Sequence, residues 1–72
     1  MKYETIWNPL TSSLKKVVGR DVSIEFRNGE TAVGELIQRD GDAFECAKIL
    51  FRHYEIKSIK IFPATKVRRS TT

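Results

Sequence analysis

An alternating run that ends in a turn dipeptide, at residues 21–29, limits most strongly what this chain can fold into. Val22, Ile24 and Phe26 alternate with polar residues, so an extended segment here has one apolar face and one solvent-facing side. Asn28-Gly29 follows directly, and this pair readily adopts the positive φ angles of a tight hairpin turn. We therefore predict a half-buried strand that turns back into a second strand.

The residues after this hairpin carry the pattern of further short strands. Gly34 lies inside the second strand and predicts a sharp bend, because a glycine in a strand otherwise weakens pairing. The turn cluster 40–42 leads into a third strand over about 43–48. An apolar, β-rich stretch follows with no recognisable turn before it, and the insertion 57–58 predicts a tight bend before a last strand. The chain is expected to contain about five short strands.

A short amphipathic helix is predicted ahead of these strands. Asn8 can accept a hydrogen bond from an early backbone amide, and Pro9 suits the first helical position. One helical stripe is apolar and consists of Leu10, Leu14, Val17 and Val18. The segment 1–6, together with Trp7, is expected to be an ordered lead-in, because its apolar side chains need a partner.

Basic residues are concentrated near the end of the chain. The 72 residues have room for one domain, predicted at 1–63, followed by a basic, flexible tail at 64–72. The net charge is +4, but removing Lys66, Arg68 and Arg69 from the 13 basic residues leaves ten against nine acidic ones. Affinity for a polyanion is therefore expected from the tail, from a local patch, or from a modest site repeated around an oligomer.

Several function classes have no support in the sequence. The single cysteine, Cys46, rules out an internal disulfide and a multi-cysteine zinc site, and is interpreted as a buried thiol. We find no metal-ligand cluster, activated nucleophile or phosphate-binding glycine loop, so we predict no cofactor, no metal and no enzymatic activity. With no membrane-length apolar run and no signal-peptide pattern, the expected location is cytoplasmic.

Two spaced motifs run through residues 8–62. The first consists of Asn8-Pro9-Leu10, Leu14-Lys15-Lys16, Gly19, Val22-x-Ile24-x-Phe26-x-Asn28-Gly29, Gly34-x-Leu36 and Asp40. The second is Phe51-Arg52-His53, followed by Ile56 and Ile59. Together they resemble the motifs of Sm and Sm-like (LSm) proteins, including the bacterial member Hfq. The resemblance implies a mainly β fold, a small SH3-like (Sm-like) five-stranded bent barrel with an N-terminal α-helix.

The resemblance also implies a homo-oligomeric ring of identical subunits that contacts single-stranded RNA near its central pore, on the loops 40–44 and 52–54. The implied RNA-binding residues are Arg52, His53, Phe44, Asp42 and Asp40, with tail contacts from Lys66, Arg68 and Arg69. In this group Arg52 and His53 would donate hydrogen bonds, and Phe44 would stack on a base. The sequence departs from the Sm pattern at residues 42–44, where the uridine-reading Asn is missing.

Each of these side chains also has a structural interpretation, which the sequence leaves open. Arg52 could form an ion pair with Asp40 or a neighbouring acid, His53 could be an exposed strand-end residue, and Phe44 could belong to the core. The function is therefore either a ring-forming RNA-binding protein or a structural or protein-interaction ring that has lost the RNA site. In either case, we expect neighbours to pair through the segments near 50–54 and 58–62, because a small barrel leaves strand edges unpaired.

Overall fold

The structure, a computed structural model, describes residues 3–63, so the predicted tail with Lys66, Arg68 and Arg69 lies outside the described residues. The elements in chain order are β1 (Glu4–Trp7), α1 (Thr11–Lys15), β2 (Asp21–Phe26), β3 (Thr31–Glu35), β4 (Ile37–Asp40), β5 (Ala43–Cys46), β6 (Ile49–Arg52), the 3-10 turn η1 (His53–Glu55) and β7 (Ile56–Ile61). The fold is thus mainly β with one short helix.

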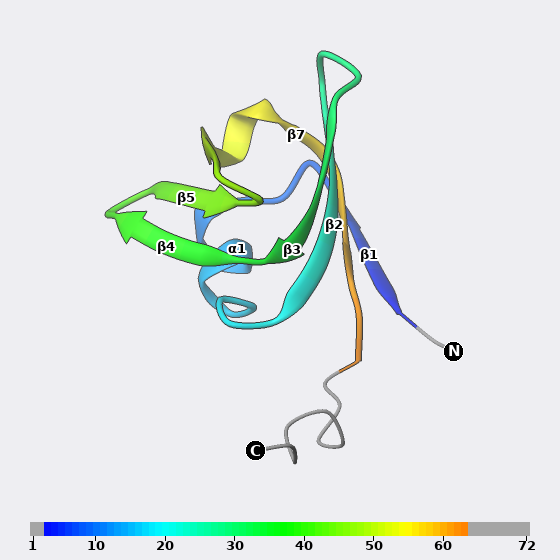
Figure 1. Cartoon of the computed structure of the whole chain (residues 1–72), viewed down its shortest axis with the longest axis horizontal. Helices are drawn as coiled ribbons and strands as arrows, with labels where there is room; N and C mark the ends of the chain where they lie inside the picture. The colour runs from blue at the N-terminus through cyan, green and yellow to red at the C-terminus, as the bar shows by residue number, and fades with distance from the viewer. Residues whose placement is uncertain (1–2, 64–72) are drawn as a thin grey trace.

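The strands form two antiparallel sheets (Figure 1). A four-stranded sheet has the order β1-β7-β2-β3, and a three-stranded sheet has the order β4-β5-β6. The chain passes from the first sheet to the second at Leu36, between β3 and β4, so these two strands correspond to the single bent strand predicted from the sequence. Leu36 is buried, and its backbone exchanges hydrogen bonds with Gly19 (2.8 Å) and Arg20 (3.0 Å). The sequence predicted the bend at Gly34, and the structure places it two residues later, at Leu36.

The alternation predicted at 21–27 is confirmed by the core. Val22, Ile24 and Phe26 are buried, and Val22 and Ile24 lie opposite Ile61 and Ile59 of β7 in the antiparallel register. Apolar side chains from both sheets and from α1 fill the space between them; the largest fully buried ones include Phe44, Leu14, Ile24, Leu36, Ile56 and Ile59.

The hairpin between β2 and β3 also follows the sequence prediction. Gly29 has φ +94°, a left-handed value that favours glycine, and its N–H donates to the carbonyl oxygen of Phe26 (3.0 Å). The Asn28 side chain accepts from the Glu30 N–H at 2.9 Å. This local hydrogen bond is one that asparagine commonly makes in turns.

The described part of the N-terminal segment is ordered, as predicted, but the helix after it differs from its prediction. Residues 4–7 form a strand, β1, and the helix is only five residues long, beginning at Thr11. Asn8 does not cap this helix: its φ is +50°, and its side-chain oxygen accepts from the guanidinium of Arg27. Trp7 was expected to find an apolar partner but is 61% exposed.

Two further connections differ from the sequence predictions. The turn between β5 and β6 is made by Ala47 and Lys48 with φ +52° and +67°, values that non-glycine residues adopt infrequently. The predicted bend at 57–58 is instead a β-bulge, because the register between β2 and β7 shifts at Glu25/Phe26 while β7 continues to Ile61.

The two sides of β7 are both occupied within the chain. β1 pairs with it from Glu4↔Ile61 to Trp7↔Ser58, and β2 pairs with its other side. The prediction that the segment 58–62 pairs with a neighbouring subunit is therefore wrong for this conformation, because β1 already takes the backbone groups on that edge.

Candidate nucleic-acid interface

The register of the three-stranded sheet brings the two predicted RNA loops together. Ala43 lies opposite Arg52, so the turn 40–42 that precedes β5 adjoins η1, which follows β6. Arg52 Nε donates to Asp42 Oδ1 at 3.3 Å, and both side chains are about half exposed. The structure thus places Arg52 and Asp42, which are ten residues apart in sequence, in direct contact at one end of the molecule.

Asp42 is the acid that pairs with Arg52, not Asp40. The hydrogen bond with Asp42, and after it one with the Tyr54 side chain, raise the pKa of Arg52 above its already high usual value. Arg52 therefore stays charged at every accessible pH. A guanidinium has five N–H donors, and this one commits only part of them to protein partners. Asp40 is exposed at the end of β4.

His53 points toward the segment that precedes the helix. Its Nδ1 lies 3.3 Å from the carbonyl oxygen of Pro9, a contact that requires Nδ1 to carry the proton. Its ring meets the Tyr54 ring edge-on, with centroids 5.6 Å apart. His53 is partly buried, so its ring anchors η1 against the segment before α1 more than it faces solvent.

Phe44 does not belong to the interface. Its side chain is 0% exposed, and it is the largest fully buried side chain of the described residues. A ring in this position cannot stack on a base unless the core opens. The core interpretation of Phe44 is the one that the structure shows, because β5 directs Phe44 between the two sheets.

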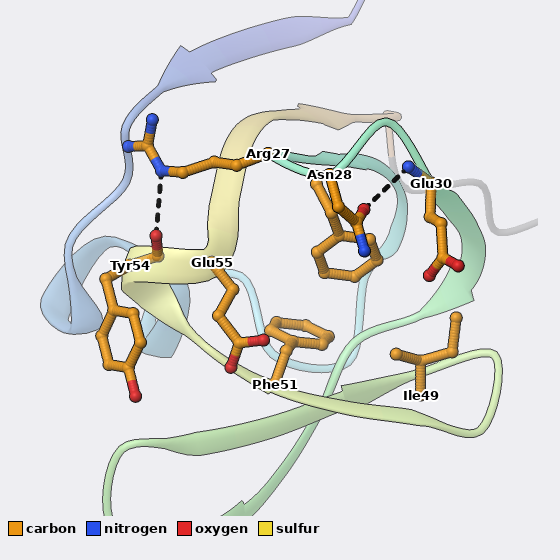
Figure 2. A pocket seen from close by; sticks show the side chains of 8 residues that line it. Arg27, Asn28, Glu30, Ile49, Phe51, Tyr54 and Glu55 are labelled. Atoms are coloured by element: carbon orange, nitrogen blue, oxygen red, sulfur yellow. Dashed lines mark hydrogen bonds between the residues drawn. The ribbon is translucent and has the colours of Figure 1, made fainter.

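A pocket of about 320 Å³ includes Phe51 and Tyr54, which flank Arg52 and His53 in the sequence (Figure 2). It opens between the β2–β3 turn and the segment from β6 to η1. The residues that line it are Phe26, Arg27, Asn28, Glu30, Ile49, Phe51, Tyr54 and Glu55. Phe26 and Phe51 pack edge-to-face with centroids 5.2 Å apart and are almost fully buried, so they form an apolar floor. The polar members form the rim, which is the usual character of a site for a small flat group.

Hydrogen bonds fix the rim of this pocket. The N–H of Arg27 donates to the carbonyl oxygen of Glu55 (3.0 Å), and its Nε donates to the carbonyl oxygen of Tyr54 (2.9 Å). Glu55 Oε2 accepts from the Arg52 N–H at 3.1 Å, which holds this carboxylate near the Phe51 ring (Figure 2). Glu30 approaches from the opposite side of the pocket. The site can therefore accept hydrogen bonds from N–H donors on the edge of a ring seated on the floor.

The sequence analysis assigned no binding role to the pocket residues. Asn28 was recognised as a turn residue and Phe51 as part of a motif, but nothing in the linear sequence places them next to each other. One available signal was Tyr54, an aromatic residue next to two predicted RNA-binding residues. It is 58% exposed at the margin of the pocket.

Acidic and basic side chains are equally numerous in the described part of the chain. Residues 3–63 contain nine basic and nine acidic side chains. Three of the basic side chains form ion pairs, Arg39 with Glu45, Arg52 with Asp42 and Lys57 with Glu25. Exposed pairs of this kind contribute little to stability. They do reduce the local attraction for phosphate.

Within the described residues, no group of three or more His, Cys, Asp or Glu side chains is arranged to hold a metal ion. None of their helices has both the length and the apolar character needed to cross a membrane. Comparison of the chain with protein-family models, with curated proteins and with solved structures gives no match.

Proposed function

We propose that the chain is an Sm-like, ring-forming protein that binds single-stranded RNA at the end of the molecule formed by the turn 40–42, η1 and the adjoining pocket. The order of the strands from β2 to β7, with a bend between β3 and β4, supports the Sm-like part of this proposal, although the described strands form two sheets and not a closed barrel. The observation that carries the RNA assignment is the Ala43↔Arg52 register, which joins the two loops that the resemblance implies.

The proposed contacts divide between a base and the backbone of the RNA. A base enters the pocket over the Phe26–Phe51 floor, and the exposed Tyr54 ring offers a neighbouring stacking surface. Arg52, with Nε held by Asp42, directs its remaining N–H groups to a phosphate or a base edge. Each site alone would bind RNA weakly. A ring would raise the overall affinity, because several subunits would contact one RNA molecule at the same time.

A second candidate is a structural or protein-interaction ring of the same fold. It is favoured by the equal numbers of acidic and basic side chains in residues 3–63 and by the burial of Phe44. In this alternative, Arg52 and Asp42 only join β6 to the turn before β5. The two candidates give different results when Arg52 is replaced.

The test is a titration of the full chain with short uridine-rich and adenine-rich RNA at low and moderate salt. Arg52→Ala is expected to weaken binding by about tenfold or more, since a good multi-donor contact is worth about 1–3 kcal/mol. Arg39→Ala is the matched control, because Arg39 is also an exposed arginine paired with an acid, Glu45. The control should bind within about twofold of the parent chain. The oligomer mass of each preparation is measured alongside.

If Arg52→Ala forms intact assemblies and binds RNA with unchanged affinity, the assignment of Arg52 to the RNA-binding site is wrong. Loss of thermal stability in Arg52→Ala, reproduced by Asp42→Ala, would favour the structural candidate. Removal of residues 64–72 gives a separate reading: it should flatten the salt dependence of RNA binding, because three basic side chains per subunit leave with the tail. An unchanged salt dependence would show that the tail does not contribute to RNA binding.

A further inference from the structure

Within residues 3–63, no strand pairs with the outer edge of β1. The Asn8 N–H donates to the Lys57 carbonyl on one side of β7, while the Phe62 N–H donates to the Asp21 carbonyl on the other side, both at 3.0 Å. Backbone groups of successive residues in a strand point to alternate sides. Glu4 and Ile6 therefore face β7, and the N–H and C=O groups of Thr5 and Trp7 face away from it.

The outer edge of β6 has the matching arrangement. Arg52 lies opposite Ala43, but its N–H donates to the Glu55 carboxylate, so it faces away from β5. By the same alternation, the N–H and C=O groups of Leu50 also face outward. Glu55 caps the edge at Arg52, and Leu50 remains as the open hydrogen-bonding position.

The side chains at these positions are large, apolar and exposed. Trp7 on β1 is 61% exposed and Leu50 on β6 is 63% exposed. Their neighbours along each strand, Ile6 and Phe51, point the other way and pack with the core. Trp7 and Leu50 thus lie at the two open edges, with outward-facing backbone groups and no apolar cover from the other residues that the structure describes.

We propose that β6 of one copy adds in antiparallel fashion to β1 of the next copy, with Leu50 opposite Trp7. This register pairs the outward-facing backbone groups of Leu50 and Trp7, and it brings Phe51 opposite Ile6 on the inner face. Arg52 lies opposite Thr5, where its N–H stays with the Glu55 carboxylate and its C=O can accept from the Thr5 N–H. The register shifted by two, with Leu50 opposite Thr5, would instead set Lys48 against Trp7. The occupant of each edge is therefore a second copy of this chain.

The other strand edges are less suited to such pairing. β4 carries Arg39 and Asp40 and has a bulge between Gln38 and Asp40, and charges and bulges both discourage addition of a further strand. On β3, Gly34 and the charged Glu35 occupy the last part of the strand, and a glycine or a charged residue at an edge makes pairing with a further strand less favourable.

The two edges lie on opposite flanks of the molecule, with β1 on one side and the three-stranded sheet on the other (Figure 1). Contact between different surfaces of identical copies is head-to-tail, so it generates a ring when the rotation closes. The inference specifies the assembly within the proposed function, and it replaces β7 with β1 as the strand that meets the neighbour. It does not depend on RNA binding.

The test introduces opposite charges at the two residues of the predicted contact. The oligomer mass of each variant is measured by sedimentation and native mass spectrometry, at micromolar concentration and without RNA. Leu50→Lys and Trp7→Glu should each weaken assembly by on the order of tenfold or more, because each buries an unpaired charge at the centre of the contact. The double variant should recover assembly, because the two new charges face each other. Leu50→Lys combined with Val33→Glu is the matched control, since Val33 is 64% exposed on β3, and should not recover it.

A monomeric parent chain, or equal recovery of assembly in the control pair, would overturn the proposal. RNA titration of the folded Leu50→Lys monomer then tests the RNA site separately, so failure of the interface and failure of the RNA assignment are distinguishable.

Discussion

Strands β7 and β6 both carry several large apolar residues. Among the strands that the structure describes, β7 lies between two others, whereas β6 has a partner on one side only. Ile59 in the middle of β7 is 0% exposed, and Leu50 in the middle of β6 is 63% exposed. The comparison teaches that an apolar strand residue can stabilise either the monomer or a contact between copies. Which of the two it does depends on the neighbours that the topology gives its strand.

The largest expected difference between the two strands is in monomer stability. Ile59→Ala should lower the free energy of unfolding by about 2–5 kcal/mol, because it leaves a cavity between β1, β2 and the core. Leu50→Ala should change it by less than about 0.5 kcal/mol, as is usual for an exposed side chain. Urea unfolding of both variants, at a concentration where the chain is monomeric, measures this difference.

Ile59→Val serves if the alanine variant does not fold, and its expected cost is about 0.5–1.5 kcal/mol. Similar destabilisation of the monomer by the Ile59 and Leu50 substitutions would show that β6 is buried within one copy, contrary to the structure.

A smaller effect is expected at Glu55, which caps the open edge of β6. Glu55→Ala should lower the free energy of unfolding by about 1 kcal/mol, because the Arg52 N–H loses its acceptor. Hydrogen exchange at the Arg52 amide should become faster. Glu30→Ala is the matched control on the facing side of the pocket, since the Glu30 side chain does not cap Arg52. If exchange at Arg52 is unchanged in Glu55→Ala, the cap does not form in solution.

The smallest effect concerns the thiol on β5, the strand next to β6. Burial, and after it the negative charge of Asp21, raise the pKa of Cys46. The folded chain therefore holds this proton more tightly than the unfolded chain. The resulting stabilisation is complete below the usual thiol pKa of about 8.5 and is lost as the pH rises through the raised value. Cys46 should react with thiol reagents much more slowly than a free thiol at pH 8.

The alkaline loss of stability is isolated by comparing the parent chain with Cys46→Ala between pH 7 and 9.5. The difference in unfolding free energy between the two should shrink as the pH rises. Fast labelling of Cys46 under native conditions would mean that β5 opens readily, and that the three-stranded sheet is far less stable than the four-stranded one.

Local patterns predicted the parts of the fold in which side-chain periodicity and turn chemistry agree. The alternation of Val22, Ile24 and Phe26 predicted β2, and Asn28-Gly29 predicted the hairpin that follows it. Both the strand pattern and the turn depend on residues that are close in sequence. The turn at Ala47 and Lys48 escaped prediction, since neither residue type favours the positive φ that both adopt. Tertiary pairing of β5 with β6 overrides that local preference.

The candidate site was predictable only in part. Arg52 and Asp42 were both proposed, and the structure brings them together, but with Asp42 rather than Asp40 as the ion-pair partner. Phe44 was proposed for stacking as well as for the core, and it proves to be buried. Alternation places Phe44 on one face of a strand, yet it cannot say whether that face meets solvent or a second sheet.

The sequence by itself determined the β character of the chain, the first hairpin and the concentration of positive charge after Pro63, because these follow from composition and from contacts between near neighbours. Only the tertiary structure decided that β1 fills one side of β7, that Trp7 and Leu50 lie at open edges, and that the pocket forms between the β2–β3 turn and η1. The pairing of β1 with β7 joins residues more than fifty positions apart, as in Glu4↔Ile61. It depends on which distant strand offers a free edge, and no local pattern of side chains carries that information.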